Sequence, residues 1–449
     1  MSEALLDQQI TTSPSVREAL AQVGTPAYVY DLAEVRRNAR RLRAALPEEC
    51  SLYYSLKANP HPALLGELRA GGAEPEVCSP GELDATLDAG WPAADALYTG
   101  PGKRDADVAA ALRSGVRKFS VDSPAALDQL DRIAADLGVH ARCLLRVNDD
   151  QPTPGQRLAM TGVPSQFGAD AGWVLAEPAR FAGRPHASVV GLHLYMGTNL
   201  VSADDLVAQF GHTLRTATRL SGALEAEGAT IEVLDLGGGF GAPFAKAGAA
   251  VEFDGMRERL EELFDDGVPG WREGRPAIAF ESGRYLVGTA GTLVTSVLDT
   301  KRSHGREIVV LESGINHLGG MSGLRRLPPL VPHLLTVDRA AGPAETTETT
   351  VVGPLCTPLD TWARNVQLPR LAPGDLLAVP NTGAYGLYAS LLAFLGHPAP
   401  AEIVVDGDRP GSPVVHASRL HLTRASIAVV PQERNDPWTS DSPSCSPDS

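Results

Sequence analysis

Short apolar runs alternate with longer amphipathic segments between residues 50 and 285. The segments between them, such as HPALLGELRAG and PAALDQLDRIAADLG, have the apolar spacing of helices. Alternating strands and helices pair in parallel, and eight such units predict an α/β protein with a closed (β/α)8 barrel. A doubly wound open sheet is the alternative that the same pattern allows. The eight runs cover residues 51–56, 73–78, 96–100, 116–121, 141–147, 187–195, 231–236 and 276–280.

From about residue 290 the pattern changes to strands joined by turns, which predicts a second, mostly β domain. The early stretch TPAYVYDL also alternates like a strand and can join this domain. The tail is rich in Ser, Pro and Asp, and we expect it to be disordered because it cannot bury enough apolar area to offset its ordering entropy. The expected strands are 292–302, 306–313, 333–339, 349–354, 375–385, 402–407 and 424–432. The expected division is an N-terminal extension (1–24), a barrel (25–290), a β domain (291–430) and the tail (431–449).

Composition and charge argue against several classes of function. The chain has 449 residues, of which 43% are hydrophobic, and its net charge is −15. The charge and the lack of a basic block argue against nucleic-acid binding. No apolar run has the length of a membrane span, and the N-terminus lacks the features of a signal peptide. Five cysteines without a metal-ligand spacing favour a reduced cytoplasm and no metal site.

Residues whose side chains could catalyse a reaction or bind a ligand follow several predicted strands. In a barrel of this kind the active site lies at the C-terminal strand ends, where the loops converge. Lysine is rare, with five lysines against 34 arginines, yet Lys57 ends the first apolar run. The other candidates at strand ends are Glu76, Tyr195, Gly237, Gly238, Gly239, Glu281 and Arg284.

Lys57 and the glycine-rich loop together suggest a cofactor. Each has a simpler interpretation, since a strand-end lysine is commonly a solvated charge and a glycine run is commonly a flexible turn. A lysine inside a barrel, however, is desolvated, which lowers its pKa and lets the neutral amine form a Schiff base with a carbonyl. Glycine N–H groups can approach an anion closely. Pyridoxal 5'-phosphate (PLP) offers both a carbonyl and a phosphate.

The remaining candidates fit the same ligand. Glu281 can keep the pyridine nitrogen protonated, Arg284 can help to hold the phosphate, and Tyr195 can stack on the ring. In the β domain, Tyr385 follows a glycine, and its hydroxyl can bond a phosphate. Cys356 lies in the polar turn GPLCTPLD, where a buried structural cysteine is the alternative interpretation.

Eight motifs occur in an order that resembles a known family. They are TPAYVYDL, YYSLKANP, EVCSPGEL, GLHLYMGTN, LDLGGGFG, ESGRYLVG, GPLCTPLD and GAYG. From about residue 25 to 430 the chain resembles the fold-type III PLP-dependent decarboxylases, the group of the diaminopimelate, ornithine and arginine decarboxylases. The resemblance implies an alanine-racemase-like barrel, a companion β domain and decarboxylation of an amino acid.

The resemblance also implies residue roles. Lys57 carries the cofactor, and Glu76 takes the place of an acidic residue near it. The glycines 237–239, with Arg284 and Tyr385, bind the phosphate. A further pairing places Glu281 against the pyridine nitrogen.

A second set of roles concerns the β domain. Cys356 resembles the family's proton donor, supplied from the other subunit of a homodimer, and Asp360 closes the same loop. The active site is then shared, and a monomer is expected to be inactive.

Three positions depart from the family pattern. Tyr195 stands where histidine is usual, and Ser282 replaces a proline. The residue after the loop cysteine is usually acidic and binds the distal ammonium of a diamino acid, but here it is Thr357. Threonine cannot pair a desolvated ammonium. The three together look like a specialised branch that acts on modified or tethered amino acids, such as glutamyl groups on a carrier protein, citryl-diaminopropionate in siderophore assembly, and the substrates of exosortase-associated decarboxylases.

Three other functions stay open at this point. The first is a diaminopimelate decarboxylase whose distal site is rebuilt, with Arg325 and Arg326 binding a distal carboxylate. The second is a racemase, which the acidic Glu281 disfavours because alanine racemases place an arginine at the pyridine nitrogen. The third is a non-catalytic homologue that acts as a binding protein.

Overall fold

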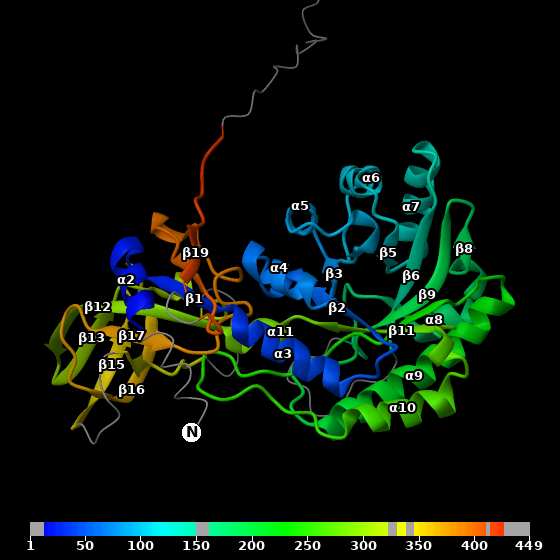
Figure 1. Ribbon diagram of the computed structural model, residues 1–449. Coiled ribbons are helices and arrows are strands. Elements are labelled where there is room, and N and C mark those ends of the chain that lie inside the picture. The colour runs from blue at the N-terminus through cyan, green and yellow to red at the C-terminus, as the bar shows by residue number, and fades with distance from the viewer. Residues whose placement is uncertain (1–12, 150–160, 322–329, 338–344, 410–413, 426–449) are drawn as a thin grey trace, which may run out of the picture.

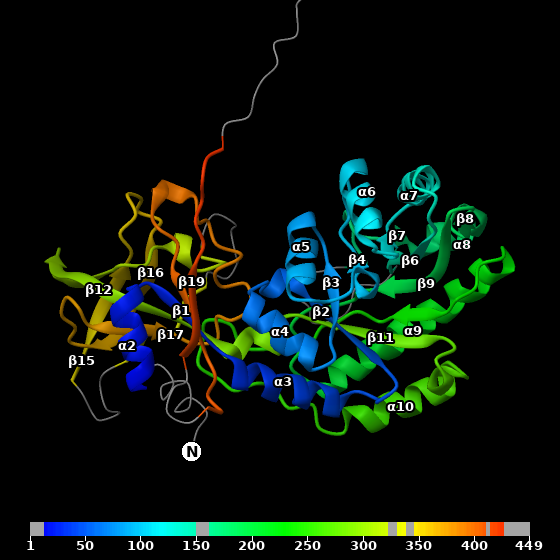
Figure 2. The ribbon, with the colours of Figure 1, turned by 45° about the horizontal axis from the view of Figure 1, so that its top comes forward.

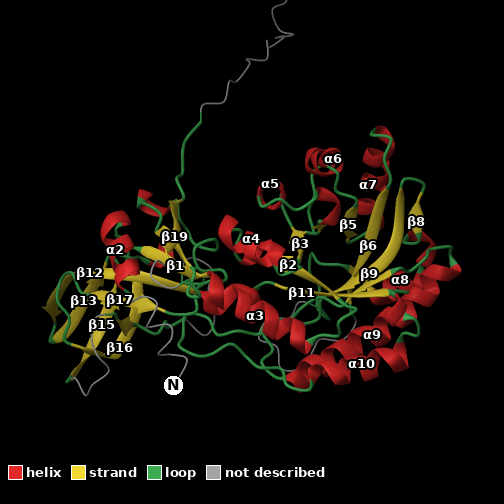
Figure 3. Cartoon of the chain, in the orientation of Figure 1, coloured by secondary structure: helices red, strands yellow, loops and turns green. Residues whose placement is uncertain are grey.

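The computed structural model describes residues 13–149, 161–321, 330–337, 345–409 and 414–425. They form two sheets, one closed into a helix-covered barrel and one in a mostly β domain. The two lie at opposite ends of the molecule, with most helices around the barrel (Figure 1 and Figure 3). Among the described residues, no helix has both the length and the apolar character to cross a membrane.

Eight parallel strands form the barrel, and pairing of β6 with β9 closes it. Every one of the eight apolar runs contributes one of these strands, so the predicted (β/α)8 fold is confirmed and the open-sheet alternative is wrong. Two short strands, β7 (Ala169–Asp170) and β8 (Gly183–Arg184), extend the same sheet. The barrel strands are β2 (Ser51–Ser55), β3 (Glu74–Val77), β4 (Leu97–Tyr98), β5 (Lys118–Val121), β6 (Ala141–Asn148), β9 (Ala187–Leu194), β10 (Val233–Asp235) and β11 (Ala277–Ser282).

Helices alternate with the strands and cover the outside of the barrel (Figure 2). Three of them are capped by Ser79, Ser123 and Ser202, whose hydroxyls accept a backbone N–H three residues later and so satisfy one free donor of the first helical turn. The helices are α3 (Leu32–Ala45), α4 (Pro62–Ala70), α5 (Pro80–Asp88), α6 (Asp105–Ser114), α7 (Pro124–Asp136), α8 (Ala171–Ala176), α9 (Ala203–Ala226), α10 (Met256–Gly267) and the one-turn α11 (Arg284–Val287).

The β domain incorporates the first strand of the chain. Strand β1 lies between β12, to which it is antiparallel, and β18, to which it is parallel. Helix α3 then leads from this sheet to the barrel, so both ends of the described chain help to build the β domain. Its strands are β1 (Ala27–Asp31), β12 (Gly291–Ser303), β13 (Arg306–Leu311), β14 (Leu335–Thr336), β15 (Thr346–Val352), β16 (Thr361–Pro369), β17 (Leu376–Val379), β18 (Ala401–Val405) and β19 (Val414–Arg419).

Two strands of this domain do not follow from the sequence pattern. Neither β16 nor β19 has regular alternation: β16 mixes buried and exposed positions, and β19 is largely exposed at the sheet edge. Of the strand expected at 424–432, only residues 424 and 425 are described, and the tail at 431–449 lies wholly outside the described residues.

Part of the N-terminal extension packs on the β domain. Helix α2 (Pro14–Val23) buries Val16 and Leu20 against a cluster that includes Val29 and Ile403. This helix is therefore part of the second core rather than a free segment.

Candidate active site

The end of β2 places Lys57 at the barrel mouth. The strand stops at Ser55 and a 3-10 turn, Leu56–Ala58, follows. Leu56 and Ala58 are fully buried, which fixes the turn, while the Lys57 side chain is 45% exposed in an open pocket. The backbone N–H of Tyr385 donates to the Ala58 carbonyl at 2.8 Å, so the β domain is bonded directly to this turn.

Seven of the predicted site residues line one pocket. It encloses about 370 Å³ of empty space, including its open mouth. Residues from β2, from the loops after β9, β10 and β11, and from the β domain meet there. The seven are Lys57, Tyr195, Gly238, Gly239, Glu281, Arg284 and Tyr385.

Lys57 is paired with Glu76, which is buried on the adjacent β3. The Lys57 Nζ lies 3.2 Å from Glu76 Oε2, and the same carboxylate accepts bonds from Thr99 Oγ1 and Cys78 Sγ. Although burial alone would raise the pKa of Glu76, the charge of Lys57 and these donors lower it to about 2.

The expected lowering of the Lys57 pKa is wrong. Desolvation does act to lower it, but the charge of Glu76, with smaller contributions from other neighbouring groups, raises the pKa well above its usual value. Lys57 is therefore an ammonium in this pocket, and it has to lose a proton before its nitrogen can act as a nucleophile. Glu76 is in contact with that proton.

The glycine loop after β10 has no room for side chains. A Cβ at Gly237 would lie 2.4 Å from the Leu194 carbonyl oxygen, and one at Gly238 would lie 2.5 Å from the Glu281 carbonyl oxygen. Gly237 and Gly239 also have positive φ angles of 70° and 125°. Gly238 and Gly239 line the pocket, whereas Gly237 uses its carbonyl to accept the Glu281 N–H at 2.8 Å.

Arg284 and Tyr385 face the same part of the pocket. The Arg284 guanidinium carbon lies 4.9 Å from the Tyr385 ring centre, a cation–π contact that orients both side chains. With the bare backbone of Gly238 and Gly239 beside them, a guanidinium and a phenol make a site suited to a phosphate.

Tyr195 packs against the glycine loop. Its ring carbons lie 3.0 and 3.5 Å from the positions that Cβ atoms of Gly237 and Gly238 would take. The ring therefore forms part of the pocket wall beside the glycines, and Lys57 and Tyr385 belong to the same lining.

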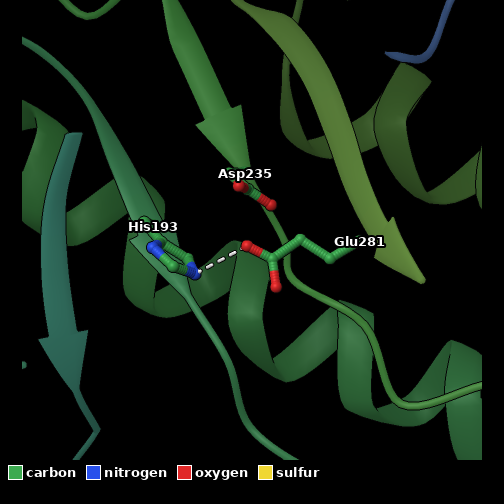
Figure 4. Close-up of side chains that lie close together, drawn as sticks. All are labelled: His193, Asp235 and Glu281. Carbon is green, nitrogen blue, oxygen red and sulfur yellow. Dashed lines mark ion pairs between the residues drawn. The ribbon is translucent and has the colours of Figure 1, made fainter. Parts of the chain in front are cut away.

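Glu281 belongs to a buried cluster that sequence reasoning missed (Figure 4). His193 Nε2 lies 3.1 Å from Glu281 Oε1, and Asp235 is the third member. The sequence does hold a signal for His193 and Asp235, because each is an ionisable residue inside an apolar strand. His193 lies two residues before Tyr195 and Asp235 two residues before Gly237, so each is expected on the same strand face as that candidate.

The loop with Cys356 does not contribute to the pocket of its own chain. Cys356 is exposed, so the interpretation as a buried structural cysteine is wrong. Neither Thr357 nor Asp360 lines the pocket. The Asp360 carboxylate is buried and accepts the N–H groups of Ile315 and Leu355 at 2.8 and 2.7 Å, so it shapes the loop from inside. The two arginines Arg325 and Arg326 lie outside the described residues.

The pocket fits PLP in each part. A lysine lines it, tightly packed glycines with Arg284 and Tyr385 offer an anion site, and Glu281 is buried on β11 between β10 and β2. These features define an enzyme that holds pyridoxal phosphate at the mouth of a (β/α)8 barrel.

A family model makes the assignment more specific. The model described as "Pyridoxal-dependent decarboxylase, pyridoxal binding domain" matches residues 32–288. The chain belongs to the pyridoxal-dependent decarboxylases, and its cofactor is PLP. The racemase and the non-catalytic alternatives are therefore set aside.

Relatives and solved structures agree with this family. The chain is 33% identical over 387 residues to the L-glutamyl-[BtrI acyl-carrier protein] decarboxylase of Niallia circulans, covering 85% of this chain and 88% of that protein. It is 30% identical over 383 residues (83% and 92%) to the 2-[(L-alanin-3-ylcarbamoyl)methyl]-2-hydroxybutanedioate decarboxylase of Staphylococcus aureus. It is also 33% identical over 399 residues (86% and 88%) to the diaminopimelate decarboxylase of Methanothermobacter thermautotrophicus.

The crystal structure of lysine decarboxylase from Selenomonas ruminantium superimposes with a TM-score of 0.73 at 27% identity, covering 88% of this chain and 96% of that one. The predicted enzyme class, cofactor and two-part fold are confirmed.

Proposed function

We propose that this decarboxylase removes the α-carboxyl group of an amino acid, or amino-acid conjugate, whose side chain carries no free ammonium. Thr357 carries the proposal, because it stands where the resemblance implies an acidic residue. The only carboxylate of the loop 353–361 is that of Asp360, which is buried and already accepts two backbone N–H groups. A diamino acid would leave its distal ammonium without a partner there, which is costly in a desolvated site.

Two relatives support this substrate class, because their names describe substrates of this kind. A decarboxylase needs a free α-carboxyl, so a glutamyl group on a carrier protein is attached through its side-chain carboxyl. In the substrate named for the Staphylococcus aureus enzyme, the side-chain nitrogen is acylated and forms an amide. Neither substrate has a side-chain ammonium. We extend the proposal to a specialised biosynthetic pathway in which a carrier protein can present the conjugate.

The homodimer is part of the proposal. Cys356 is exposed and its neighbour Leu359 is 76% exposed, so both are accessible to a partner subunit. In this arrangement Cys356 of the partner subunit faces the pocket and delivers a proton to the α-carbon, and Thr357 of the partner subunit lies near the distal end of the substrate.

Each pocket residue then has a defined task. Bound PLP supplies the electron sink for the electron pair left when CO2 departs. Gly238, Gly239 and Arg284 would hold the phosphate, and Glu281 would pair with the ring nitrogen. Lys57 would hold the cofactor and would share its proton with Glu76.

A substrate panel tests the proposal. CO2 release is measured with meso-diaminopimelate, L-ornithine, L-lysine, an N-acylated 2,3-diaminopropionate and a γ-glutamyl thioester of pantetheine. We expect at least one conjugate to have a kcat/KM roughly 100-fold or more above those of the free diamino acids. A free diamino acid that matches or exceeds the conjugates would overturn it.

Diaminopimelate decarboxylation remains the second candidate, because a diaminopimelate decarboxylase matches at the same identity as the carrier-protein enzyme. It predicts stoichiometric L-lysine from meso-diaminopimelate, which amino-acid analysis of the same reactions detects.

A further inference from the structure

The buried cluster behind the pocket consists of His193, Asp235 and Glu281 (Figure 4). The three residues lie on the neighbouring strands β9, β10 and β11, and their nearest ligand atoms are within 4.8 Å of one another. The His193 and Glu281 side chains are 2% and 4% exposed, and Asp235 is fully buried. Only Glu281 also lines the pocket. The cluster therefore reaches the cofactor site through Glu281.

Hydrogen bonds hold His193 and Asp235 in place, and an ion pair joins His193 to Glu281. His193 Nδ1 lies 2.9 Å from Ser120 Oγ, which leaves Nε2 facing Glu281 at 3.1 Å. Asp235 Oδ1 accepts the N–H of Gly237 at 2.9 Å and so connects the cluster to the glycine loop. Among the described residues, Asp235 Oδ2 has no hydrogen-bond partner and is buried.

The cluster has more negative than positive groups. With all members ionised, two carboxylates face one imidazolium, and an unmatched buried charge is unfavourable. Burial opposes charging His193, but Glu281 and Asp235 raise its pKa. Burial and the charge of Glu281 raise the pKa of Asp235 to about 7. Without a further cation, the cluster therefore retains an extra proton near neutral pH.

Other charged groups nearby leave this imbalance in place. Arg146 on β6 pairs in register with His193, and its charge opposes protonation of that imidazole. On the pocket side, Glu76 adds to the negative potential at Asp235, while its own charge is matched by Lys57. Tyr53 on β2 keeps its phenol neutral, because burial and the neighbouring carboxylates raise its pKa.

We propose that His193 and Asp235 are positioning residues that act through Glu281: His193 fixes one oxygen of the carboxylate, and Asp235 cancels the charge of His193. The negative charge of Glu281 is then left for a cation in the pocket, and the protonated ring nitrogen of PLP is that cation. The pairing of Glu281 with the ring nitrogen follows from the family resemblance; the charge balance behind it is the new element. It depends on the cofactor and not on the identity of the substrate.

The proposal predicts opposite effects of two neutral substitutions. Asp235→Asn keeps an oxygen for the Gly237 N–H but removes a negative charge, so the ring nitrogen should lose its proton at a lower pH. His193→Gln keeps an N–H near Glu281 but removes a positive charge, so the ring nitrogen should keep its proton to a higher pH. Removing a unit charge several ångströms from the ring nitrogen should shift the pH at which that nitrogen loses its proton by at least about one unit. The double variant restores the charge balance and should return close to the wild type.

The experiment follows the ring nitrogen directly. Each variant is reconstituted with PLP labelled with ¹⁵N in the ring, and the ¹⁵N chemical shift is recorded as a function of pH. Glu281→Gln serves as the reference for a ring without its carboxylate, and melting curves of the cofactor-free proteins check the fold. Opposite shifts in the single variants and recovery in the double variant support the proposal.

Equal or same-direction shifts, or a double variant no better than Asp235→Asn, would show a purely structural cluster. If Asp235→Asn does not fold, the direction in His193→Gln decides: an upward shift supports the proposal, and no shift or a downward one overturns it. If His193→Gln does not fold, Asp235→Asn decides, with a downward shift in support and any other result against.

Discussion

The barrel mouth and the Cys356 loop differ in how completely one chain builds them. At the mouth, Lys57, Glu76 and Glu281 are held by partners within the same chain and lie in or against a defined pocket. In the loop, the only carboxylate is turned inward, and Cys356 and Leu359 are exposed to solvent. One chain therefore builds the cofactor half of the site, and under the function proposed above a second subunit completes the substrate half.

Contacts between the domains explain why the cofactor half is complete. The Tyr385 N–H bonds the Ala58 carbonyl, and the Asn59 side chain donates to the Gly383 carbonyl at 2.8 Å. The β-domain segment that carries Tyr385 is thus anchored to the turn that carries Lys57. No comparable bond joins the Cys356 loop to the pocket among the described residues.

The largest expected effect comes from Lys57→Arg. Arginine preserves the charge beside Glu76 but cannot lose a proton to act as a nucleophile. We expect kcat to fall by roughly 1000-fold or more and the absorbance band of the lysine-bound cofactor to disappear, with the cofactor-free melting temperature retained. Lys301→Arg, at an exposed position, is the matched control and should behave as wild type. Persistence of the band would contradict the assignment of Lys57.

Cys356→Ala should separate the two halves of the site. Loss of a proton donor lowers kcat by roughly 10²- to 10⁴-fold. The affinity for PLP should stay within about twofold of wild type, because the cofactor contacts lie elsewhere. Steady-state kinetics and PLP titration measure the two quantities. A large loss of PLP affinity would place Cys356 in the cofactor half instead.

Thr357→Asp should shift substrate preference. A carboxylate at this position can pair a distal ammonium, so kcat/KM for ornithine or lysine should rise roughly tenfold or more, while that for a neutral conjugate falls. The comparison is made in the substrate panel above. Thr347→Asp, at an exposed position on β15, controls for the added charge. No change in preference would remove Thr357 from the substrate half.

The smallest effect concerns the stability of the cofactor-free protein. The folded pKa of Glu76 is about 2, below its usual 4.5, so its contribution is present above pH 4.5 and is lost as the pH falls through about 2. Because Lys57 is 45% exposed, Glu76→Gln should lower the free energy of unfolding by only about 1–2 kcal/mol at pH 6, and by less at pH 3.5.

Urea unfolding at the two pH values measures this difference. The control is Glu74→Gln, which breaks the partly exposed pair with Lys118 and should cost less than about 1 kcal/mol. An equal loss for Glu76→Gln at both pH values would assign its effect to hydrogen bonding rather than to charge.

Sequence patterns predicted the fold where burial is regular. The barrel strands are buried on both faces, so even the two-residue β4 appears as an apolar run. The pattern fails for β16 and β19 because an edge strand with exposed positions has no strict alternation. Strand ends also identified the pocket, since Lys57 follows one apolar run and Glu281 and Arg284 follow another.

What sequence could not supply is the partner of each charge. The direction of the Lys57 pKa shift depends on a carboxylate 3.2 Å away on another strand, and burial alone gave the wrong sign. The proposed roles of His193 and Asp235 were likewise not predictable, because they depend on side chains that β9, β10 and β11 bring together.

Mixing two inactive variants tests most directly whether the two halves belong to different subunits. Lys57→Ala and Cys356→Ala are each purified, mixed in equal amounts, dissociated and allowed to reassociate. Half of the dimers then combine one chain of each kind, and one of their two sites has both Lys57 and Cys356. The account predicts recovery of about a quarter of wild-type activity. A mixture that re-forms dimers but stays inactive would contradict it, because Lys57 and Cys356 would then have to act within one chain.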